Sequence, residues 1–433
     1  TDKWSDNDYW GGRQPFTHIW HKLITEWIKR DRNRPSIILW SLGNELQIRE
    51  GWAGFEGTND WGITTYNIFN QLVKRWDNTR LTTVAMFPAR AGAITRHDKE
   101  FNDYLVPPEL ACATEVASFN YQSDKYDAYL KYKPDLILFQ SEAETSNLLQ
   151  PYYNMDRKRT VGMAYWGSAE YWGESNKWPK KGWNYSFFDH TMRPYPQAYL
   201  IKSAFMPEIP EVHIGVVDAA GAESVSWNDV IVGRMALNEC WNHTPGSRQS
   251  LFTFTNAHSV ELLVNGQSMG VQENDTTQAN LRNMIYWKDV PYGNGGSVVA
   301  IARDKSGKEV ARHHIETAGK AVALRIEAET PADWKADGMD LQYINVTAID
   351  KKGRPVWDYN KPLTLQMEGA AWLVALDNGD HYTDELFHGI TSKRMYQGRM
   401  QIILRSTKTP SNVKLEISSA DLKEKLSLKT SLK

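Results

Sequence analysis

The feature that most constrains the fold is a short apolar run that ends abruptly in two polar residues. Residues 36–42 read SIILWSL, in which only two small hydroxyl side chains interrupt the bulky ones. This composition is typical of a strand that is buried on both faces, as in a parallel sheet. Asn44 and Glu45 follow at its C-terminal end, where barrel enzymes carry their catalytic groups. Glu45 is therefore a catalytic candidate, and a solvated Glu at the start of a loop is the alternative.

Helical and strand patterns alternate over the first 206 residues. Apolar side chains recur at helical spacing over residues 16–28, with Pro15 in the first turn, and again over residues 68–76. Further buried strands are predicted at residues 81–87, 116–121, 136–139 and 160–166. Short helical segments are predicted between them, at residues 107–110, 126–132 and 147–153. This rhythm predicts an α/β fold with five strands of a (β/α)8 barrel, three fewer than closure requires.

The pattern changes after Met206. Pro207, Pro210 and the run IGVV predict a linker, after which apolar residues alternate with period two. The dipeptide Asn265-Gly266 between two such runs predicts a β-hairpin with a type I′ turn.

Three domains are predicted from these changes of pattern. Residues 1–206 are predicted to form part of a (β/α)8 barrel. Strands at sandwich spacing then predict two immunoglobulin-like β-sandwich domains, at residues 207–319 and 320–433.

Composition argues against several classes of protein. The 50 basic and 52 acidic residues give a net charge of -2, which does not favour binding to nucleic acid or to a membrane surface. Cys112 and Cys240 are too few for a disulfide scaffold, and no zinc-binding spacing is present, so we expect no metal and no cofactor. The adjacent His313 and His314 are interpreted as solvated strand positions.

A second carboxylate is needed if the chain hydrolyses glycosides with retention of configuration, because that reaction uses one carboxyl group as acid and base and another as nucleophile. Glu142 is the first carboxylate after the predicted strand 136–139, and Glu144 is its competitor. The C-terminal ends of barrel strands share one rim, so distant segments of the chain meet there. The sequence therefore predicts Glu45 and Glu142 as a catalytic pair.

Four motifs in order along the chain resemble glycoside hydrolase family 2, which includes β-galactosidases, β-glucuronidases and β-mannosidases. They are RNRPSIILWSLGNE, FNY at residues 119–121, LILFQSE and GMAYWGSAEYWGE. The resemblance covers residues 1 to about 205 closely. It extends more loosely over the two β-rich blocks, which are similar to the C-terminal domains of long bacterial members, particularly those of gut Bacteroidales.

The resemblance implies a role for each residue at the strand ends. Glu45 would be the general acid and base, and Glu142 the nucleophile. Asn44 would hydrogen-bond the sugar 2-hydroxyl, and Tyr121 would hold the Glu142 carboxylate in its attacking orientation. The alternative for Tyr121 is a core tyrosine whose hydroxyl lies at the rim.

Three further residues of the last motif are implied to bind substrate. Trp166 would form the apolar floor of the sugar subsite, with packing inside the barrel as its alternative. Glu170 and Glu174 would shape the sugar pocket or brace its loop.

The activity implied is that of a retaining exo-β-glycosidase acting on an oligosaccharide or glycoside without a redox cofactor or catalytic metal. We favour a β-galactosidase over a β-glucuronidase, because Asn176-Lys177-Trp178 lacks the Asn-x-Lys spacing of a uronate clamp. A periplasmic or secreted bacterial protein is expected. The alternative class is a non-catalytic carbohydrate-binding or assembly fragment.

Members of this family carry three more barrel strands and two further domains ahead of the helix that starts near Pro15. The chain begins in what resembles the loop after the third strand, so the five predicted strands correspond to barrel strands 4 to 8. The resemblance thus makes residues 1–206 the C-terminal part of the catalytic barrel domain. We expect the N-terminal half of the enzyme to be needed for full activity, and we expect that half or a second copy of the chain as a partner.

Overall fold

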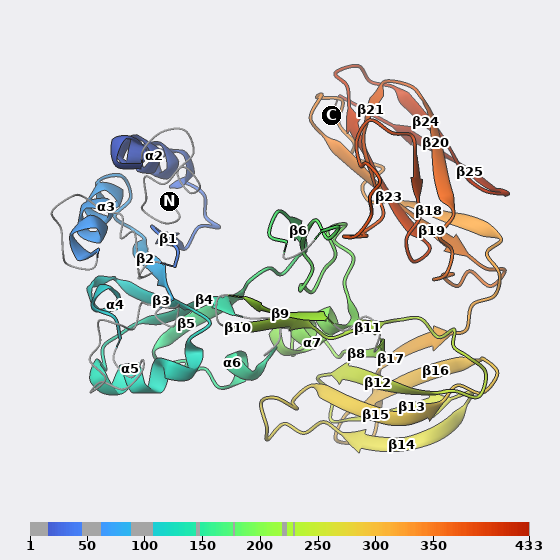
Figure 1. Cartoon of the computed structure of the whole chain (residues 1–433), viewed down its shortest axis with the longest axis horizontal. Coiled ribbons are helices and arrows are strands. Elements are labelled where there is room, and N and C mark those ends of the chain that lie inside the picture. The colour runs from blue at the N-terminus through green and yellow to red at the C-terminus, as the bar shows by residue number, and fades with distance from the viewer. Residues whose placement is uncertain are drawn as a thin grey trace. The chain divides into compact units, whose positions relative to one another are not determined.

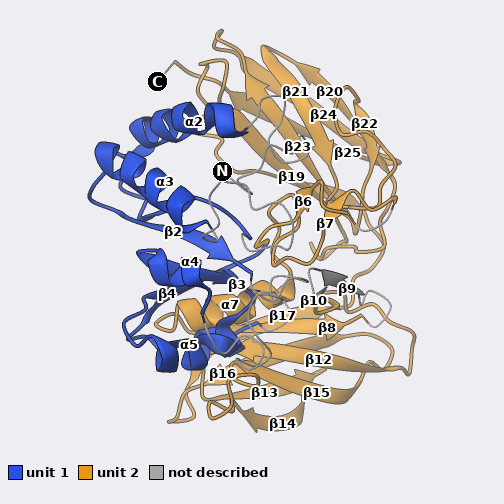
Figure 2. Cartoon of the chain, turned by 60° about the vertical axis from the view of Figure 1, so that its left-hand side comes forward, with its two compact units in different colours: residues 1–166, 224–233 blue, residues 167–223, 234–433 orange. Residues whose placement is uncertain are grey.

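The structure, a computed structural model, describes residues 16–45, 62–87, 107–143, 148–175, 178–218, 223–227 and 230–432. The chain divides into two compact units (Figure 2): residues 1–166 with 224–233, and residues 167–223 with 234–433. None of the helices in the described ranges has the length and apolar character needed to cross a membrane.

The first unit is built on a five-stranded parallel sheet (Figure 1), in which neighbours in the sequence are neighbours in space. Its strands are β1 (Leu39–Ser41), β2 (Leu81–Met86), β3 (Val116–Asn120), β4 (Leu138–Ala143) and β5 (Thr160–Tyr165). Every adjacent pair is parallel. The C-terminal ends of all five strands therefore lie along the same edge of the sheet.

Helices connect these strands and supply much of the core. They are α2 (Phe16–Asp31), α3 (Ile63–Trp76), α4 (Glu109–Ala113), α5 (Tyr126–Tyr132) and α6 (Gln150–Tyr153). Ile24 and Ile28 on α2 are fully buried in one cluster with Trp40 of β1 and Val84 of β2. Each such side chain contributes roughly 1.5–3 kcal/mol of transfer free energy. The structure thus confirms the alternation of helices and strands that was predicted from the sequence of this unit.

The predicted bounds of two strands are wrong. The strand predicted at residues 36–42 is limited to β1, and the one predicted at 136–139 begins two residues later and continues to Ala143. Glu142 lies opposite Asn120 in the parallel register, inside β4 instead of beyond its tip. The polar residues Gln140 and Ser141 before Glu142 led to a predicted end at residue 139. The strand continues through them because main-chain pairing does not depend on side-chain polarity.

The second unit contains two pairs of four-stranded sheets. The first pair consists of β11-β8-β12-β15 and β14-β13-β16-β17, whose inner faces share one hydrophobic core. Its strands are β8 (Val212–Val217), β11 (Leu237–Asn238), β12 (Arg248–Thr255), β13 (Ser259–Val264), β14 (Gln267–Glu273), β15 (Met284–Pro291), β16 (Ser297–Arg303) and β17 (Glu309–Glu316).

The linker predicted after Met206 is wrong over the residues of β8. This strand pairs with β12 along five residues and is buried over most of its length. The run IGVV is therefore a strand of the core, and only the residues around Pro207 and Pro210 precede it as a connection. The predicted hairpin is confirmed, because Asn265 and Gly266 join β13 to β14 with φ angles of 51° and 81°, both positive as a type I′ turn requires.

The second pair of sheets is β18-β19-β23-β21 and β22-β20-β24-β25, again around one core. Its strands are β18 (Ala323–Ala328), β19 (Leu341–Ile349), β20 (Pro362–Glu368), β21 (Ala371–Asp377), β22 (Ser392–Arg394), β23 (Arg399–Ser406), β24 (Asn412–Ser419) and β25 (Leu422–Lys429). The loop after β21 is a turn with Gly379 at φ 77°.

A less regular segment precedes the first pair of sheets. It contains the short hairpin of β6 (Tyr171–Trp172) and β7 (Gly182–Trp183), followed by α7 (Pro196–Phe205), which packs against β8 and β12. A separate two-stranded ribbon is formed by β9 (Glu223–Trp227) and β10 (Val230–Arg234).

Candidate active site

Four of the predicted site residues lie at the C-terminal edge of the parallel sheet. Glu45 follows β1, Tyr121 follows β3 directly, Glu142 is the penultimate residue of β4, and Trp166 follows β5 directly. Glu45 and Glu142 are buried, with exposed fractions of 5% and 8%. The fold of this unit therefore brings polar side chains from separate strands to one edge.

A short hydrogen bond joins β3 to β4 at this edge. The Tyr121 hydroxyl donates to Glu142 Oε2 at 2.6 Å, and the Tyr121 backbone N–H donates to the Glu142 carbonyl oxygen at 2.8 Å. A hydrogen bond to an ionised carboxylate is stronger than one between neutral groups and fixes the orientation of the carboxylate. The side chain and the backbone of Tyr121 thus both hold Glu142.

Asn120 links the strands on either side of it. Its Nδ2 donates to Asn44 Oδ1 at 3.1 Å, and its Oδ1 accepts from the Ser141 hydroxyl at 2.7 Å. Asn120 is completely buried, so these contacts satisfy an amide that water does not reach. No separate role was predicted for Asn120 from the sequence. Its place between Asn44 and β4 shows that it positions both.

The backbone is unusual at two of these positions. Glu45 has φ 47° and Tyr121 has φ 60°, in the left-handed region that side chains other than Gly rarely adopt. Residues held in this conformation cost of order 1–3 kcal/mol and cluster at functional sites. The loop after β1 is nonetheless fixed to β2, since the Ala85 N–H donates to the Gly43 carbonyl at 2.9 Å.

Aromatic side chains lie beside the polar ones. Phe87, at the end of β2, is buried and contacts Tyr121 edge to face with ring centroids 5.5 Å apart. The Trp166 backbone N–H donates to the Ala143 carbonyl at 2.9 Å, and Trp166 is half-buried. Phe87 was not singled out from the sequence, although it occupies the same strand-end position as Tyr121 and Trp166.

The two remaining predicted residues belong to the second unit. Glu174 is exposed and accepts a hydrogen bond from the Tyr171 hydroxyl. Glu170 is 5% exposed and lies in a cluster of charged and aromatic residues of its own unit. The competitor Glu144 and the pair Asn176-Lys177 lie outside the described residues.

We call Glu170, His190 and His381 the Glu170 cluster. Glu170 Oε1 accepts from the Tyr195 hydroxyl at 2.8 Å and from Arg234 Nη1 at 3.0 Å, while Glu170 Oε2 faces His381 Nε2 at 3.0 Å and His190 Nδ1 at 3.6 Å. Burial alone would raise the pKa of Glu170, but His190, His381 and Arg234 outweigh it and lower that pKa to about 2.

A second group, the Glu239 cluster, consists of His213, Glu239 and His313. The interpretation of His313 as a solvated position is wrong: its ring stacks on that of His213 with centroids 3.9 Å apart, and its side chain is 23% exposed. His314 is 46% exposed. Neighbours on a strand face opposite sides, so only one of the two histidines reaches the cluster.

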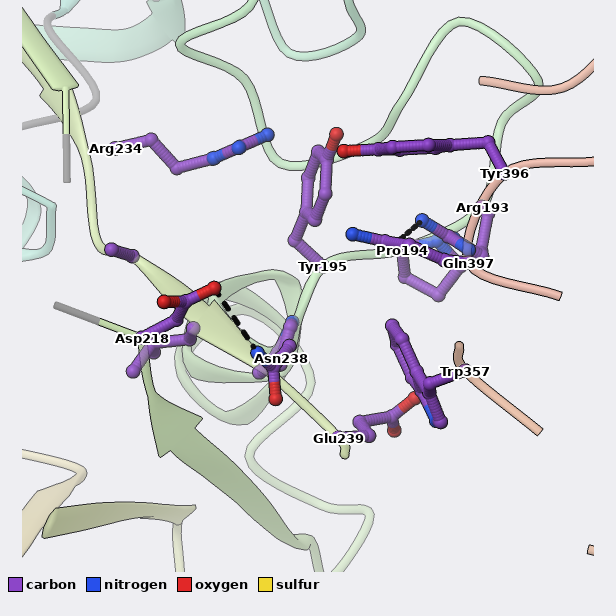
Figure 3. Close-up of a pocket in the computed structure, with 13 residues that line it drawn as sticks. Arg193, Pro194, Tyr195, Asp218, Arg234, Asn238, Glu239, Trp357, Tyr396 and Gln397 are labelled. Atoms are coloured by element: carbon purple, nitrogen blue, oxygen red, sulfur yellow. Dashed lines mark hydrogen bonds between the residues drawn. The ribbon is translucent and has the colours of Figure 1, made fainter. Parts of the chain in front are cut away.

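A small cavity lies beside Glu239 and beside Tyr195 and Arg234, two hydrogen-bond partners of Glu170 (Figure 3). Tyr195 and Arg234 form part of its wall, with the guanidinium carbon of Arg234 4.0 Å from the Tyr195 ring centroid, and Glu239 lines another part. Its volume is about 100 Å³, well below the roughly 300 Å³ at which ligand pockets begin. This cavity is too small for a sugar residue.

Sequence models of three protein-domain families match parts of the chain. Residues 11–164 match "Glycosyl hydrolases family 2, TIM barrel domain", and residues 324–426 match "Glycoside hydrolase family 2 C-terminal domain 5". Residues 246–311 match a domain of unknown function (DUF4982).

Proteins similar in sequence include enzymes from Bacteroides ovatus and Formosa agariphila. The chain is 24% identical to Beta-galactosidase BoGH2A of Bacteroides ovatus over 94% of this chain and 51% of that protein. It is 26% identical to a Beta-glucuronidase of Formosa agariphila over 38% of this chain and 14% of that protein. The chain thus spans about half the length of the Bacteroides ovatus relative.

Solved structures share its fold. A glycosyl hydrolase family 2 member from Bacteroides cellulosilyticus has a TM-score of 0.80 at 24% identity, covering 99% of this chain and 52% of that one. A beta-glycosidase from Bacteroides vulgatus has a TM-score of 0.69 at 20% identity, covering 96% and 54%.

Proposed function

The chain belongs to glycoside hydrolase family 2, in the type found in Bacteroidales, and from this premise we propose that it carries the catalytic carboxylates of a retaining exo-β-glycosidase. The observation that carries the proposal is the 2.6 Å hydrogen bond from the Tyr121 hydroxyl to Glu142 Oε2. It gives one carboxylate at the sheet edge a fixed orientation, as a nucleophile needs.

In the first step the Glu142 carboxylate attacks the anomeric carbon while Glu45 donates a proton to the leaving oxygen. The bond from the anomeric carbon to the aglycone breaks as the bond to Glu142 forms. Glu142 loses its negative charge as it bonds, and Tyr121 orients it throughout. The Asn44 amide oxygen already accepts from Asn120 at 3.1 Å, so its NH2 group is the one that would donate to the sugar 2-hydroxyl.

In the second step Glu45, now ionised, takes a proton from water, and the resulting hydroxide displaces Glu142 from the anomeric carbon. The two inversions give net retention. Phe87 and Trp166 would supply apolar surface beside the reacting sugar, since aromatic faces pack well against sugar C–H groups.

We favour a β-galactosidase, because the relative that matches 94% of the chain is named as one. A β-glucuronidase is the second candidate, supported by the name of the Formosa agariphila relative. Comparing turnover of aryl β-galactosides with that of aryl β-glucuronides, in the protein that contains this chain, separates the two.

The same proposal extends to the architecture. The five parallel strands would be strands 4 to 8 of the barrel, and each pair of four-stranded sheets an immunoglobulin-like sandwich. The substrate would be an oligosaccharide or glycoside with a terminal β-linked sugar.

A 2-fluoro glycoside tests the nucleophile directly, because it leaves the sugar covalently bound to the attacking carboxylate. We expect the label on Glu142 when the protein is digested and its peptides are sequenced by mass spectrometry. Label on Glu144 would overturn the assignment of the residue. Sugar binding without any label would favour the non-catalytic alternative.

Two variants test the other roles. Tyr121→Phe should lower kcat about tenfold to a hundredfold, the value of one hydrogen bond to a charged group, and should slow labelling by the same factor.

Glu45→Ala should lose most activity but regain it with azide on substrates with good leaving groups. Loss without rescue by azide would count against Glu45 as the acid and base.

A further inference from the structure

Three potential metal-binding atoms converge inside the second unit. Glu170 Oε2 lies 3.0 Å from His381 Nε2 and 3.6 Å from His190 Nδ1, and all three lie within 4.8 Å of one another. Ligand atoms about 2 Å from a tetrahedral zinc ion are roughly 3.3 Å apart. The spacing is therefore close to that of three ligands around one ion.

Hydrogen bonds do not account for this convergence. The side chains of Glu170, His190 and His381 are 1%, 4% and 3% exposed, so water does not replace missing partners. Yet Glu170 Oε2, His190 Nδ1 and His381 Nε2 have no hydrogen-bond partner of acceptable geometry. Buried polar atoms without partners are costly, and the 3.0 Å pair is close enough to bond but poorly directed.

The opposite sides of two ligands are already occupied. Glu170 Oε1 accepts from Tyr195 and Arg234, which leaves Oε2 for the centre of the cluster. His190 Nε2 lies 2.8 Å from Asp377 Oδ1. An ionised carboxylate only accepts hydrogen bonds, so Nε2 carries a proton and Nδ1 can offer its lone pair. A carboxylate behind a histidine is the usual outer partner of a zinc ligand.

We propose that Glu170, His190 and His381 bind a divalent transition-metal ion, zinc by preference, through Glu170 Oε2, His190 Nδ1 and His381 Nε2. Two imidazoles and one carboxylate suit zinc better than calcium or magnesium, which prefer oxygen ligands alone. Three protein ligands leave a fourth position for water. Arg234 offsets the charge of Glu170 on the side away from the ion.

The site would act as a clasp within the second unit. Glu170 and His190 belong to the segment that contains β6 and β7, whereas His381 and Asp377 belong to the end of β21 and the turn after it. The Trp172 ring covers the imidazoles, with centroids 4.7 Å from His190 and 5.2 Å from His381. A cross-link between segments so far apart in the chain restricts the unfolded state strongly.

This role differs from the sugar contact that the sequence predicted for Glu170, and it does not depend on the glycosidase reaction. The protein could hydrolyse glycosides without binding a metal ion at this site, and it could bind the ion without hydrolysing glycosides. The two proposals therefore succeed or fail on different measurements.

The first test is the metal content of the protein that contains this chain. The protein is purified in metal-free buffers, incubated with zinc and passed over a gel-filtration column to remove unbound ions. Elemental mass spectrometry should then find about one zinc ion per chain. Removal by a chelator should lower the thermal midpoint of unfolding, and zinc should restore it.

Variants locate the ion. His381→Ala should lose the stoichiometric zinc, whereas His313→Ala, the matched change in the Glu239 cluster, should keep it. Asp377→Asn should keep the ion but weaken its binding about tenfold to a hundredfold, the usual cost of an altered outer partner. Competition with a coloured chelator measures this affinity.

A readout that does not need a variant guards against misfolding. Cobalt added to the metal-free wild-type protein should give the visible absorption of a four-coordinate site, and zinc should abolish it. Absence of both zinc and the cobalt spectrum would overturn the proposal in favour of a proton shared within the cluster. Equal zinc content in His381→Ala and the wild type would overturn it too, because the ion would then be bound elsewhere.

Discussion

The Glu170 cluster and the Glu239 cluster each contain one glutamate and two histidines, but the outer ring nitrogen of one histidine has a different partner in each. In the Glu170 cluster, His190 turns its outer nitrogen to an acceptor, Asp377, at 2.8 Å. In the Glu239 cluster, His313 Nδ1 accepts from the backbone N–H of Ile214 at 3.0 Å. The outer partner therefore decides which ring nitrogen keeps a lone pair.

In the Glu239 cluster, His313 is therefore neutral and carries its proton on Nε2, the nitrogen that faces Glu239. Burial and the neighbouring His213 lower the pKa of His313 to about 4, so its ring is neutral near pH 7. Because Nδ1 accepts, the proton is on Nε2, which faces Glu239 Oε1 at 4.0 Å. That nitrogen has no lone pair to give to a metal, and the cluster consists of two stacked imidazoles with His213 Nε2 2.8 Å from Glu239 Oε1.

His190 shows the opposite electrostatics. Burial would lower its pKa, but Asp377 and Glu170 outweigh burial and raise that pKa to about 9. Without an ion the ring is therefore protonated on both nitrogens near pH 7, and a bound ion would displace the proton on Nδ1. Two carboxylates thus face one imidazole, which attracts a positive charge to the centre of the Glu170 cluster. Identical residue types give opposite charge preferences because their outer partners differ.

The largest expected difference comes from removing the carboxylate of each cluster. Glu170→Ala leaves Arg234 and the imidazoles buried without their counter-ion and should lower the free energy of unfolding by about 3–5 kcal/mol. Glu239→Ala should cost about 1–3 kcal/mol, because the Glu239 side chain is 29% exposed. Denaturant unfolding measures both, and equal losses would contradict the distinction between the clusters.

The pH dependence of stability sharpens the comparison next. A histidine whose pKa is about 6.5 when unfolded and about 4 when folded binds more protons in the unfolded state between those values. Stability contributed by a neutral His313 is thus fully present above pH 6.5 and is lost as pH falls toward 4, by about 3 kcal/mol.

His313→Gln should flatten that part of the stability curve, measured as denaturant midpoints from pH 7 to pH 4. His314→Gln is the matched control, because the 46% exposed neighbour should leave the slope unchanged. An unaltered slope in His313→Gln would show that another group titrates there.

The smallest effects are expected from two tyrosines that serve the clusters in different ways. Tyr195 donates its hydroxyl to Glu170 Oε1 at 2.8 Å, so Tyr195→Phe should cost about 1–2 kcal/mol. Tyr199 contributes its ring, stacked on His213 with centroids 3.5 Å apart, and Tyr199→Phe should stay within about 0.5 kcal/mol of the wild type. The thermal midpoints of the two variants measure this difference. A larger loss in Tyr199→Phe than in Tyr195→Phe would show that the stacking depends on the Tyr199 hydroxyl.

Much of the first unit was predictable because its signals are local. Helical spacing and apolar runs along the chain indicate the alternation of α2, α3 and the strands, and the polar residues at the end of an apolar run indicated Glu45. Glu142 was found for the same reason, although the polar residues before it placed the end of β4 too early. The roles of Tyr121 and Trp166 were implied only by the resemblance to glycoside hydrolase family 2. Catalytic roles for these residues remain predictions that the labelling experiment tests.

The chain by itself determined that a parallel sheet forms and that two carboxylates lie near its C-terminal edge, since strand period and strand direction follow from neighbouring residues. Only the tertiary structure decided that Glu170 is an internal ligand candidate and that His313 is partly buried against His213. His190 and His381 have no common motif, and nothing in the sequence around Asp377 indicates that it meets His190. Their meeting depends on the packing of the β6–β7 segment beside the loop after β21, and such long-range contacts leave no periodic trace in a sequence.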